Sequence, residues 1–292
     1  MSQSIYTSAN KEINEYMKIL VTGAKGMLGQ DLCPILEDEG YDVTETDVQS
    51  MDITKYDIVE DVLKTEAPDI VIHCAGYTNV DKAEEELDIA RLINSTGTEN
   101  IAKACAKQDI VLVYISTDYV FDGGINNKRT EPYSPTDVPN PLNTYGLTKW
   151  EGEEAVRKNC SKYYIVRTSW LYGIHGKNFV ETMLSLADKP ELKVVDDQVG
   201  CPTWTVELSN GIVKLLNTAK YGTYHVCGSG QTSWYGFAKK IFEEANKKVN
   251  LKPCTTDEFP RPAKRPHYSV MDNNGICRKW EVALRDYLKL RD

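Results

Sequence analysis

The chain contains 292 residues, of which 41% are hydrophobic and 26% are charged. At roughly 100–200 residues per domain, this length accommodates one large domain or two modest ones, and the composition argues against long-range disorder. The formal net charge is -9, which is a poor match for a phosphate backbone, so nucleic acid is not expected as a partner. No apolar run approaches the roughly 20 residues of a membrane span, so no membrane partner is expected.

Residues 1–16 are polar and lack the apolar core of a signal peptide. We interpret them as a flexible leader, or as the product of a start site placed upstream of the true one at Met17. From Met17 onward, short β-rich runs alternate with longer segments of helical periodicity. Strands are expected at 18–23, 42–47, 68–75, 110–117 and 163–170, and helices at 27–39 (with Pro34 in the first turns), 57–67, 88–108 and 144–159. Near-continuous apolar strands alternating with helices predict an α/β fold with a Rossmann-type, doubly wound parallel sheet.

The pattern loosens after about Tyr172. Helices are expected at 178–189, 206–218, 234–248 and 280–291, a short strand at 222–228, and irregular structure from 253 to 266, where four prolines occur. We therefore predict a Rossmann domain over 17–172, joined by part of 203–228, and a smaller C-terminal lobe over 173–202 and 229–292.

The chain has eight cysteines, and none forms a C-x-x-C pair. Their spacing suits neither a zinc site nor a disulfide scaffold. Several lie within apolar runs, such as Cys74 in "DIVIHCAG". Buried free thiols in a reducing compartment are the simplest interpretation, so we expect a cytoplasmic protein.

A glycine-rich turn follows the first predicted strand. "VTGAKGMLG" places Gly23, Gly26 and Gly29 between that strand and a helix. Small residues let the backbone turn tightly and approach a pyrophosphate, and the helix N-terminus supplies unpaired N–H groups. Because the strand, turn and helix are all present, we predict a dinucleotide-binding site that includes the three glycines.

The choice between NADH and NADPH stays open. Asp47 ends the second strand, where a carboxylate accepts hydrogen bonds from the adenosine ribose and repels a 2′-phosphate, which favours NADH. Lys25, in the glycine turn, favours NADPH, since its cation can meet that phosphate. Asp52 is expected near the adenine amino group. The alternative for Asp47 is a solvated acid at the end of a strand.

Three polar residues form a candidate catalytic group. Tyr145 and Lys149 are four residues apart in a predicted helix, so both project from one face. A nearby ammonium is expected to lower the pKa of the phenol, which then delivers a proton to an oxygen that gains negative charge. Thr117 ends the fourth strand at the sheet edge where ligands bind, beside Ser116. A surface Tyr–Lys pair and a strand-end cap are the alternatives, and the agreement of separate segments favours catalysis.

These segments resemble the dTDP-4-dehydrorhamnose reductases, a group within the extended short-chain dehydrogenase/reductase family. The glycine turn and Y-x-x-x-K mark the whole family, whereas "NVDKAE", "STDYVFDG" and "DQVGCPT" are more specific to this group. The resemblance runs from about Met17 to the C-terminus. It implies NADH- or NADPH-dependent reduction of the 4-keto group of dTDP-4-dehydro-L-rhamnose to dTDP-L-rhamnose, with Tyr145 as proton donor, Lys149 as its partner and Thr117 orienting the oxygen.

The resemblance also implies binding residues. It places the cofactor-binding residues at Gly26, Met27, Leu28, Asp52, Ile53, Gly76, Tyr77 and Thr78, together with Tyr145 and Lys149. It places the residues that bind the nucleotide sugar at Val80, Thr117, Asp118, Trp170, Gln198, Thr203 and Arg265. Among these, Trp170 is expected to form an apolar wall for the deoxysugar. Arg265 is expected to bind the diphosphate, because a guanidinium binds phosphate oxygens in bidentate fashion.

Two other functions fit the same motifs. A non-catalytic regulatory subunit of methionine adenosyltransferase resembles this reductase group and keeps its nucleotide fold. Another extended-family nucleotide-sugar epimerase or dehydratase would retain and recycle its cofactor.

Some relatives bind Mg²⁺ between subunits through acidic residues. No matching set is identified in this sequence, since Glu84, Glu85 and Glu86 read as a solvated helix face. The sequence does not separate a monomer from a homodimer.

Overall fold

The computed structural model describes residues 17–124, 129–217 and 220–291. The predicted leader, residues 1–16, lies outside this part of the chain, as does the last residue of the helix predicted over 206–218. None of the helices in the described part is long and apolar enough to cross a membrane.

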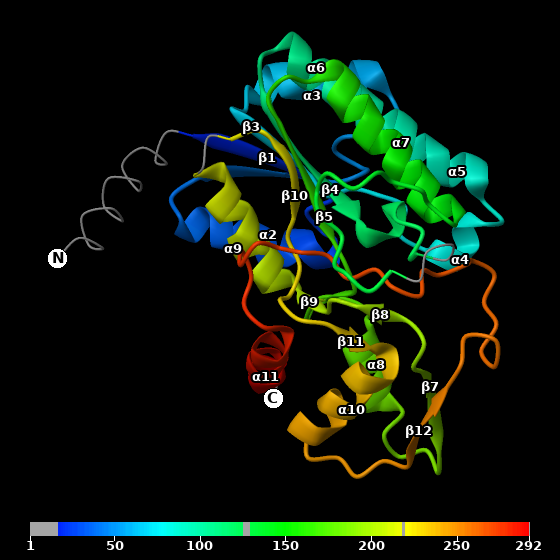
Figure 1. Cartoon of the computed structure of the whole chain (residues 1–292). Coiled ribbons are helices and arrows are strands. Elements are labelled where there is room, and N and C mark those ends of the chain that lie inside the picture. The colour runs from blue at the N-terminus through cyan, green and yellow to red at the C-terminus, as the bar shows by residue number, and fades with distance from the viewer. Residues whose placement is uncertain (1–16, 125–128, 218–219, 292) are drawn as a thin grey trace.

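A six-stranded parallel sheet forms the centre of the molecule (Figure 1). Its strands, in spatial order, are β10 (Gly222–His225), β5 (Tyr163–Thr168), β4 (Val111–Thr117), β3 (Ile70–His73), β1 (Lys18–Thr22) and β2 (Asp42–Thr46). All five pairs of neighbours are parallel. The inner strands are buried on both faces, as their continuous apolar sequences predict.

Helices cover both faces of this sheet (Figure 1). On one face, Ile19 and Val21 pack in a core with residues of α2 (Met27–Asp38) and α9 (Thr205–Leu216). On the other face, Leu20 and Val71 pack with residues of α3 (Tyr56–Glu66), α6 (Thr98–Lys107) and α7 (Thr144–Asn159). The doubly wound α/β fold predicted from the sequence is confirmed.

Several helices depart from the prediction. The helices expected over 178–189 and 234–248 end early, at Ser185 and Glu244. The helix expected over 88–108 divides into α5 (Leu87–Arg91), a π-helical turn η1 (Leu92–Gly97) and α6. Gly97 lies where a Cβ atom would come within 2.9 Å of Ile53 Cδ1, so close packing against the 47–53 loop accompanies this irregular turn. Pro34 lies in the second half of α2 rather than in its first turns.

The C-terminal part packs around a separate apolar cluster below the sheet edge (Figure 1). Three two-stranded sheets lie here: β7 (Leu192–Val195) with β12 (Leu251–Cys254), β8 (Val199–Gly200) with β11 (Thr232–Ser233), and β6 (Leu171–Tyr172) with β9 (Thr203–Trp204). The helices are α8 (Phe179–Ser185), α10 (Trp234–Glu244) and α11 (Trp280–Arg291), while α4 (Val80–Ala83) and the 3₁₀ turn η2 (Asp118–Val120) flank the main sheet. The small strands were not predicted, because two to four residues carry no readable alternation.

Candidate active site

A cavity of about 780 Å³ opens at the carboxyl ends of β1, β3, β4 and β5. It lies where the strand order reverses, with β1 next to β3 on one side and to β2 on the other. Ligands of open α/β sheets bind at such a switch point. Residues of the glycine turn line the cavity together with Thr117, Tyr145 and Lys149.

The glycine turn is shaped for close approach. Gly23 has a φ of +66°, and a Cβ atom there would lie 2.8 Å from the backbone N of Ala75. At Gly29 a Cβ atom would lie 2.5 Å from Ala24 Cα. A side chain fits at neither position, so the turn passes close to the end of β3 and delivers the N-terminus of α2, at Met27, to the cavity.

The acidic residues after β2 are held by nearby cations and amides. The Lys25 ammonium forms an ion pair with Asp47, and this hydrogen bond lowers the pKa of the carboxyl group. Asp52 accepts hydrogen bonds from the backbone N and hydroxyl of Thr54, the latter at 2.7 Å, and pairs with Lys55. Asp47, Asp52 and Ile53 all line the cavity.

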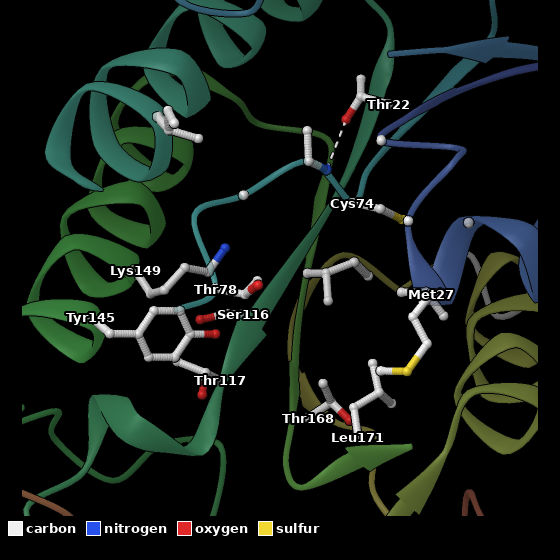
Figure 2. Close-up of a pocket in the computed structure, with 18 of the residues that line it drawn as sticks. Thr22, Met27, Cys74, Thr78, Ser116, Thr117, Tyr145, Lys149, Thr168 and Leu171 are labelled. Atoms are coloured by element: carbon white, nitrogen blue, oxygen red, sulfur yellow. Dashed lines mark hydrogen bonds between the residues drawn. The ribbon is translucent and has the colours of Figure 1, made fainter. Parts of the chain in front are cut away.

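Hydrogen bonds to two side chains, Thr22 and Asn94, hold the loop after β3 in place. Thr22 Oγ1 accepts a hydrogen bond from the backbone N of Ala75 at 3.2 Å, the dashed line in Figure 2. Asn94, in the π-helical turn, accepts a hydrogen bond from the backbone N of Tyr77 at 2.8 Å. Gly76 and Thr78 line the cavity, but Tyr77 does not, because its hydroxyl donates to Glu86. Asn94 was missed from the sequence, since its role depends on a turn that the helical pattern hides.

Tyr145, Lys149 and Thr117 converge as their spacing predicts. Figure 2 shows Tyr145 and Lys149 extending from α7 toward Ser116 and Thr117, at the end of β4. The Asn143 side chain caps α7 by accepting a hydrogen bond from the backbone N of Gly146 at 2.7 Å, which fixes the first turn.

The pKa values of this pair differ from the expectation. Burial raises the pKa of Tyr145 to about 12, and a hydrogen bond with Thr117 only partly opposes this. The predicted lowering of the Tyr145 pKa by the lysine is therefore wrong. Burial lowers the pKa of Lys149 to about 7, with Glu153 opposing it. Tyr145 thus keeps its proton at neutral pH, as a proton donor must, while the charge of Lys149 depends on pH near neutrality.

Two buried oxygen atoms at the cavity lack partners. Asp118 is 2% exposed, and burial raises its pKa to about 7. Its Oδ1 accepts a hydrogen bond from Thr117 at 3.1 Å, whereas Oδ2 has no hydrogen-bond partner among the described residues. The hydroxyl of Thr168, across the cavity in Figure 2, is also unpaired within that part of the chain. The Ser269 side chain also acts on the Asp118 carboxyl and lowers its pKa against the effect of burial. Both oxygens are therefore polar groups at the cavity that a ligand hydroxyl could reach.

Two stacked tryptophans close one end of the cavity. The rings of Trp170 and Trp234 are parallel, with centroids 3.5 Å apart, and both residues line the cavity. Trp170 has a φ of +47°, and a Cβ atom on Gly200 would lie 2.5 Å from its indole ring. Trp234 and Gly200 thus both pack closely on the Trp170 ring, which lines the cavity. Trp234 was missed from the sequence, which gave only its place at the start of a helix.

Three residues assigned to the sugar site do not line the cavity. The Thr203 hydroxyl accepts a hydrogen bond from Gly228 N and donates to Cys201 O. Gln198 donates to the Thr256 hydroxyl. Arg265 is paired with Asp81, which also binds Arg261. Each side chain is held by another partner, whereas Val80 does line the cavity as expected.

The acidic run Glu84–Glu86 follows α4 rather than forming a helix face. Glu84 accepts a hydrogen bond from the backbone N of Thr144, and Glu86 pairs with Lys82. Among the described residues, no group of three His, Cys, Asp or Glu side chains is arranged to hold a metal ion.

Comparisons with known proteins agree with this geometry. The family described as "RmlD substrate binding domain" matches residues 17–290. The chain is 43% identical over 281 residues to the spore coat polysaccharide biosynthesis protein SpsK of Bacillus subtilis, covering 94% of this chain and 98% of that protein. It is also similar to the crystal structure of a dTDP-4-dehydrorhamnose reductase from Clostridium acetobutylicum, with 46% identity, a TM-score of 0.90 and coverage of 94% and 99% of the two chains.

A second solved structure, the dTDP-4-dehydrorhamnose reductase of Bacillus anthracis, was determined in complex with NADP. It is 45% identical, with a TM-score of 0.90, and the match covers 94% of this chain and 99% of that one. The chain therefore belongs to the dTDP-4-dehydrorhamnose reductase family of extended short-chain dehydrogenases/reductases.

Proposed function

We propose that the chain reduces the 4-keto group of dTDP-4-dehydro-L-rhamnose to the alcohol of dTDP-L-rhamnose, with NADH or NADPH as the reductant. The observation that carries this proposal is the presence of Tyr145, Thr117 and Lys149 in the same cavity as the glycine turn. A regulatory subunit or an epimerase uses the same fold. Two solved structures that are 46% and 45% identical over 94% of the chain are named as reductases, whereas two epimerases that match over the same share of the chain are only 18% and 19% identical.

The residues present fit a dinucleotide. At Gly23 and Gly29 a Cβ atom would collide with nearby backbone atoms, so glycine leaves the backbone of the turn accessible. The N-terminus of α2 faces the same space, which suits a diphosphate, and Asp47 lies beside the end of β2, which suits a ribose. When bound, the reduced nicotinamide supplies a hydride equivalent to C4 of the sugar.

The chain's own residues supply the proton and the charge. Tyr145 donates its hydroxyl proton to the ketone oxygen as the C=O bond becomes C–H and O–H, which completes the balance of one hydride and one proton. Thr117 orients that oxygen, and the Lys149 ammonium stabilises the phenolate left on Tyr145. Asp118 binds a sugar hydroxyl through its unpaired Oδ2. Position and electrostatics account for most of the rate in such a site.

In this proposal the two parts of the chain bind different ligands. Residues 17–172, with part of 203–228, bind the dinucleotide, and residues 173–202 and 229–292 bind the nucleotide sugar. The position of Trp234 in α10, at the wall of the cavity, supports this division. We also place the reaction in the cytoplasm, which the eight free cysteines support.

Substitution of Tyr145 by Phe tests the proposal. We expect kcat to fall by roughly 10²–10⁴-fold, as for a lost general acid. The measurement is oxidation of NADH or NADPH with dTDP-4-dehydro-L-rhamnose, together with identification of the product. Turnover that stays near the wild-type level would contradict the assignment of Tyr145. Cofactor binding by the wild type without net oxidation would favour the regulatory or epimerase alternatives.

A further inference from the structure

The ammonium of Lys149 lies at the cavity without a carboxylate beside it. Lys149 is 5% exposed and extends from α7 near Tyr145 (Figure 2). No ion pair between described residues includes Lys149, and its ammonium donates no hydrogen bond within that part of the chain. Burial of a charge without a partner is unfavourable, which is why the pKa of Lys149 falls to about 7. A contact that favours the charged form therefore matters for the proposed reaction.

The nearest acid along α7 is held by other partners. Glu153 follows Lys149 by one helical turn, and its charge favours the ammonium. Its Oε1 accepts hydrogen bonds from Ser116 and Arg167, and its Oε2 accepts them from Arg167 and Arg157. Because two arginines share this carboxylate, its charge is largely balanced without Lys149.

The direct contact of the ammonium is an aromatic ring. Lys149 Nζ lies over the ring of Tyr114, 4.1 Å from its centroid. The face of an aromatic ring carries negative charge density and attracts an ammonium, most strongly where water is excluded. A ring face does this without cancelling the positive charge, so the ammonium remains able to stabilise a phenolate on Tyr145.

The ring of Tyr114 is held in place by the elements around it. Tyr114 is fully buried in β4, and its hydroxyl donates a hydrogen bond to the carbonyl oxygen of Lys149 at 3.3 Å. A Cβ atom on Gly152 would collide with that hydroxyl, so α7 packs directly against it. His73 of β3 stacks on the ring, with centroids 5.7 Å apart. The ring is therefore a fixed surface on which the lysine side chain rests.

The other titratable groups around the ammonium are neutral at pH 7. Burial lowers the pKa of His73 to about 3, so its ring carries no proton charge. Burial raises the pKa of the Cys74 thiol above its usual range and that of Tyr145 to about 12, so both keep their protons. Burial also raises the pKa of Tyr114 itself. None of these groups supplies a negative charge in place of the ring face.

We propose that Tyr114 is a positioning residue whose ring face holds Lys149, as the ammonium, beside Tyr145, an inference that rests on the proposed function. The ring takes the place that a carboxylate has in an ordinary ion pair. The pH range over which Lys149 assists Tyr145 then depends on the side chain at position 114.

NMR titration of protein labelled with [ε-¹³C]lysine, without coenzyme or sugar, tests this inference. The signal of Lys149 is assigned by its loss in Lys149→Arg. For Tyr114→Leu we expect the pKa of Lys149 to be lower by about one, which corresponds to the loss of a desolvated cation–π contact. Tyr114→Phe keeps the ring face and loses the hydroxyl, so the pKa should stay within about 0.3 of the wild type.

Two further variants separate the ring face from packing. Pentafluorophenylalanine at position 114 keeps nearly the shape of phenylalanine but withdraws the negative charge from the ring face, so it should lower the pKa of Lys149 as Tyr114→Leu does. It decides the question if Tyr114→Leu does not fold. Tyr172→Leu removes an equally buried ring from the C-terminal cluster and should leave the pKa of Lys149 within about 0.3 of the wild type.

The pH profile of kcat/KM for the coenzyme gives a second measurement. Tyr114→Leu should match the wild type near pH 5, where Lys149 is charged in both proteins, and should be about tenfold lower at pH 8. An equal loss at every pH, with the pKa of Lys149 unchanged, would overturn the inference, because Tyr114 would then only support packing. An equal fall of the pKa in Tyr114→Phe would overturn it as well, because the hydroxyl would then be the active group.

The NMR titration keeps this inference separate from the proposed function. It follows Lys149 itself, so the carboxyl of Asp118, whose pKa burial raises to about 7, does not enter the result. It also needs no turnover. A wild type that shows the expected titration but does not reduce the sugar would count against the proposed function alone.

Discussion

Asp118 lowers the stability of the folded protein, at a position where the proposed reaction needs a polar group. Burial raises its pKa from 3.8 to about 7. Between these values the folded state holds a proton that the unfolded state has lost, so this group's contribution to stability falls as pH rises and is lowest above pH 7. Asp118→Asn removes the titration. We expect it to stabilise the protein by up to about 4 kcal/mol at pH 8 and to have little effect near pH 4.

Urea unfolding at both pH values measures this effect. Asp122→Asn is a useful comparison, because the pKa of Asp122 is lowered despite burial, through hydrogen bonds such as those from Gly124 N and Asn140. That variant should destabilise the protein at both pH values, because a carboxyl with a lowered pKa loses its contribution to stability only as pH falls below 3.8. If Asp118→Asn changed the free energy of unfolding equally at both values, the assigned titration of Asp118 would be wrong.

Lys149 sets the expected pH dependence of the reaction. Its pKa is lowered to about 7 by burial, and that of Tyr145 is raised to about 12. If catalysis needs the ammonium, kcat/KM for the coenzyme should decrease above pH 7, by about tenfold per pH unit, because this ratio reports the free enzyme. The phenol stays protonated throughout that range. Initial rates from about pH 6 to 9 check this prediction, and a flat profile would show that the charge of Lys149 is not required.

The sequence predicted the residues whose places follow from one regular element. Tyr145 and Lys149 share a helix face, and Thr117 ends a strand, so their convergence needed only the parallel sheet. The places of Gln198 and Arg265 depend on how irregular segments meet, and the structure shows hydrogen bonds from them to Thr256 and Asp81. Their binding of the sugar nucleotide stays a prediction. The pKa of Tyr145 was predicted in the wrong direction, because the sequence does not reveal the extent of burial.

At the scale of elements, one buried ion pair joins α7 to β5. Glu153 is fully buried, and its carboxylate accepts hydrogen bonds from Arg167 at 2.7 and 2.9 Å and from Ser116 at 2.6 Å. Glu153→Gln would leave Arg167 as an uncompensated buried charge. We expect it to reduce the free energy of unfolding by about 3–5 kcal/mol.

Denaturant unfolding compares this variant with Glu154→Gln. Glu154 is the next residue in α7, and its exposed carboxylate pairs with Arg157 at 2.9 Å. Loss of that surface pair should cost less than about 1 kcal/mol. Similar losses in the two variants would indicate that the buried pair contributes no more than an exposed one.

Long periodic elements were predictable, and short ones were not. The range predicted for α7 equals the observed Thr144–Asn159, and α11 also begins and ends as predicted. By contrast, four strands have only two residues each, and each forms by pairing with a segment distant in the sequence: β6, β8, β9 and β11. The π-helical turn was hidden because its residues continue the helical pattern of the flanking segments.

At the scale of the whole molecule, the cavity joins the sheet to the C-terminal part through stacked rings. Trp170 follows β5 of the main sheet, and Trp234 begins α10. Trp234 also contacts Phe179 of α8, with ring centroids 4.5 Å apart, so several elements hold it in place. The position of the Trp170 ring at the cavity therefore depends on the packing of the C-terminal part against the sheet.

The Trp234→Ala variant tests whether the sugar site can be weakened without an effect on coenzyme binding. Without the stacked partner, Trp170 loses one of the contacts that hold its left-handed backbone conformation, and the wall of the sugar site loosens. We expect KM for the nucleotide sugar to rise by roughly 10-fold, the effect of about 1.4 kcal/mol of lost aromatic contact, with a smaller change in kcat. Trp234→Phe keeps an aromatic face and should stay within about threefold of the wild type. Because Trp234 belongs to α10 and not to the glycine turn or the end of β2, the dissociation constants of NADH and NADPH should not change. A parallel loss of coenzyme binding would mean that α10 supports the whole cavity rather than its sugar end.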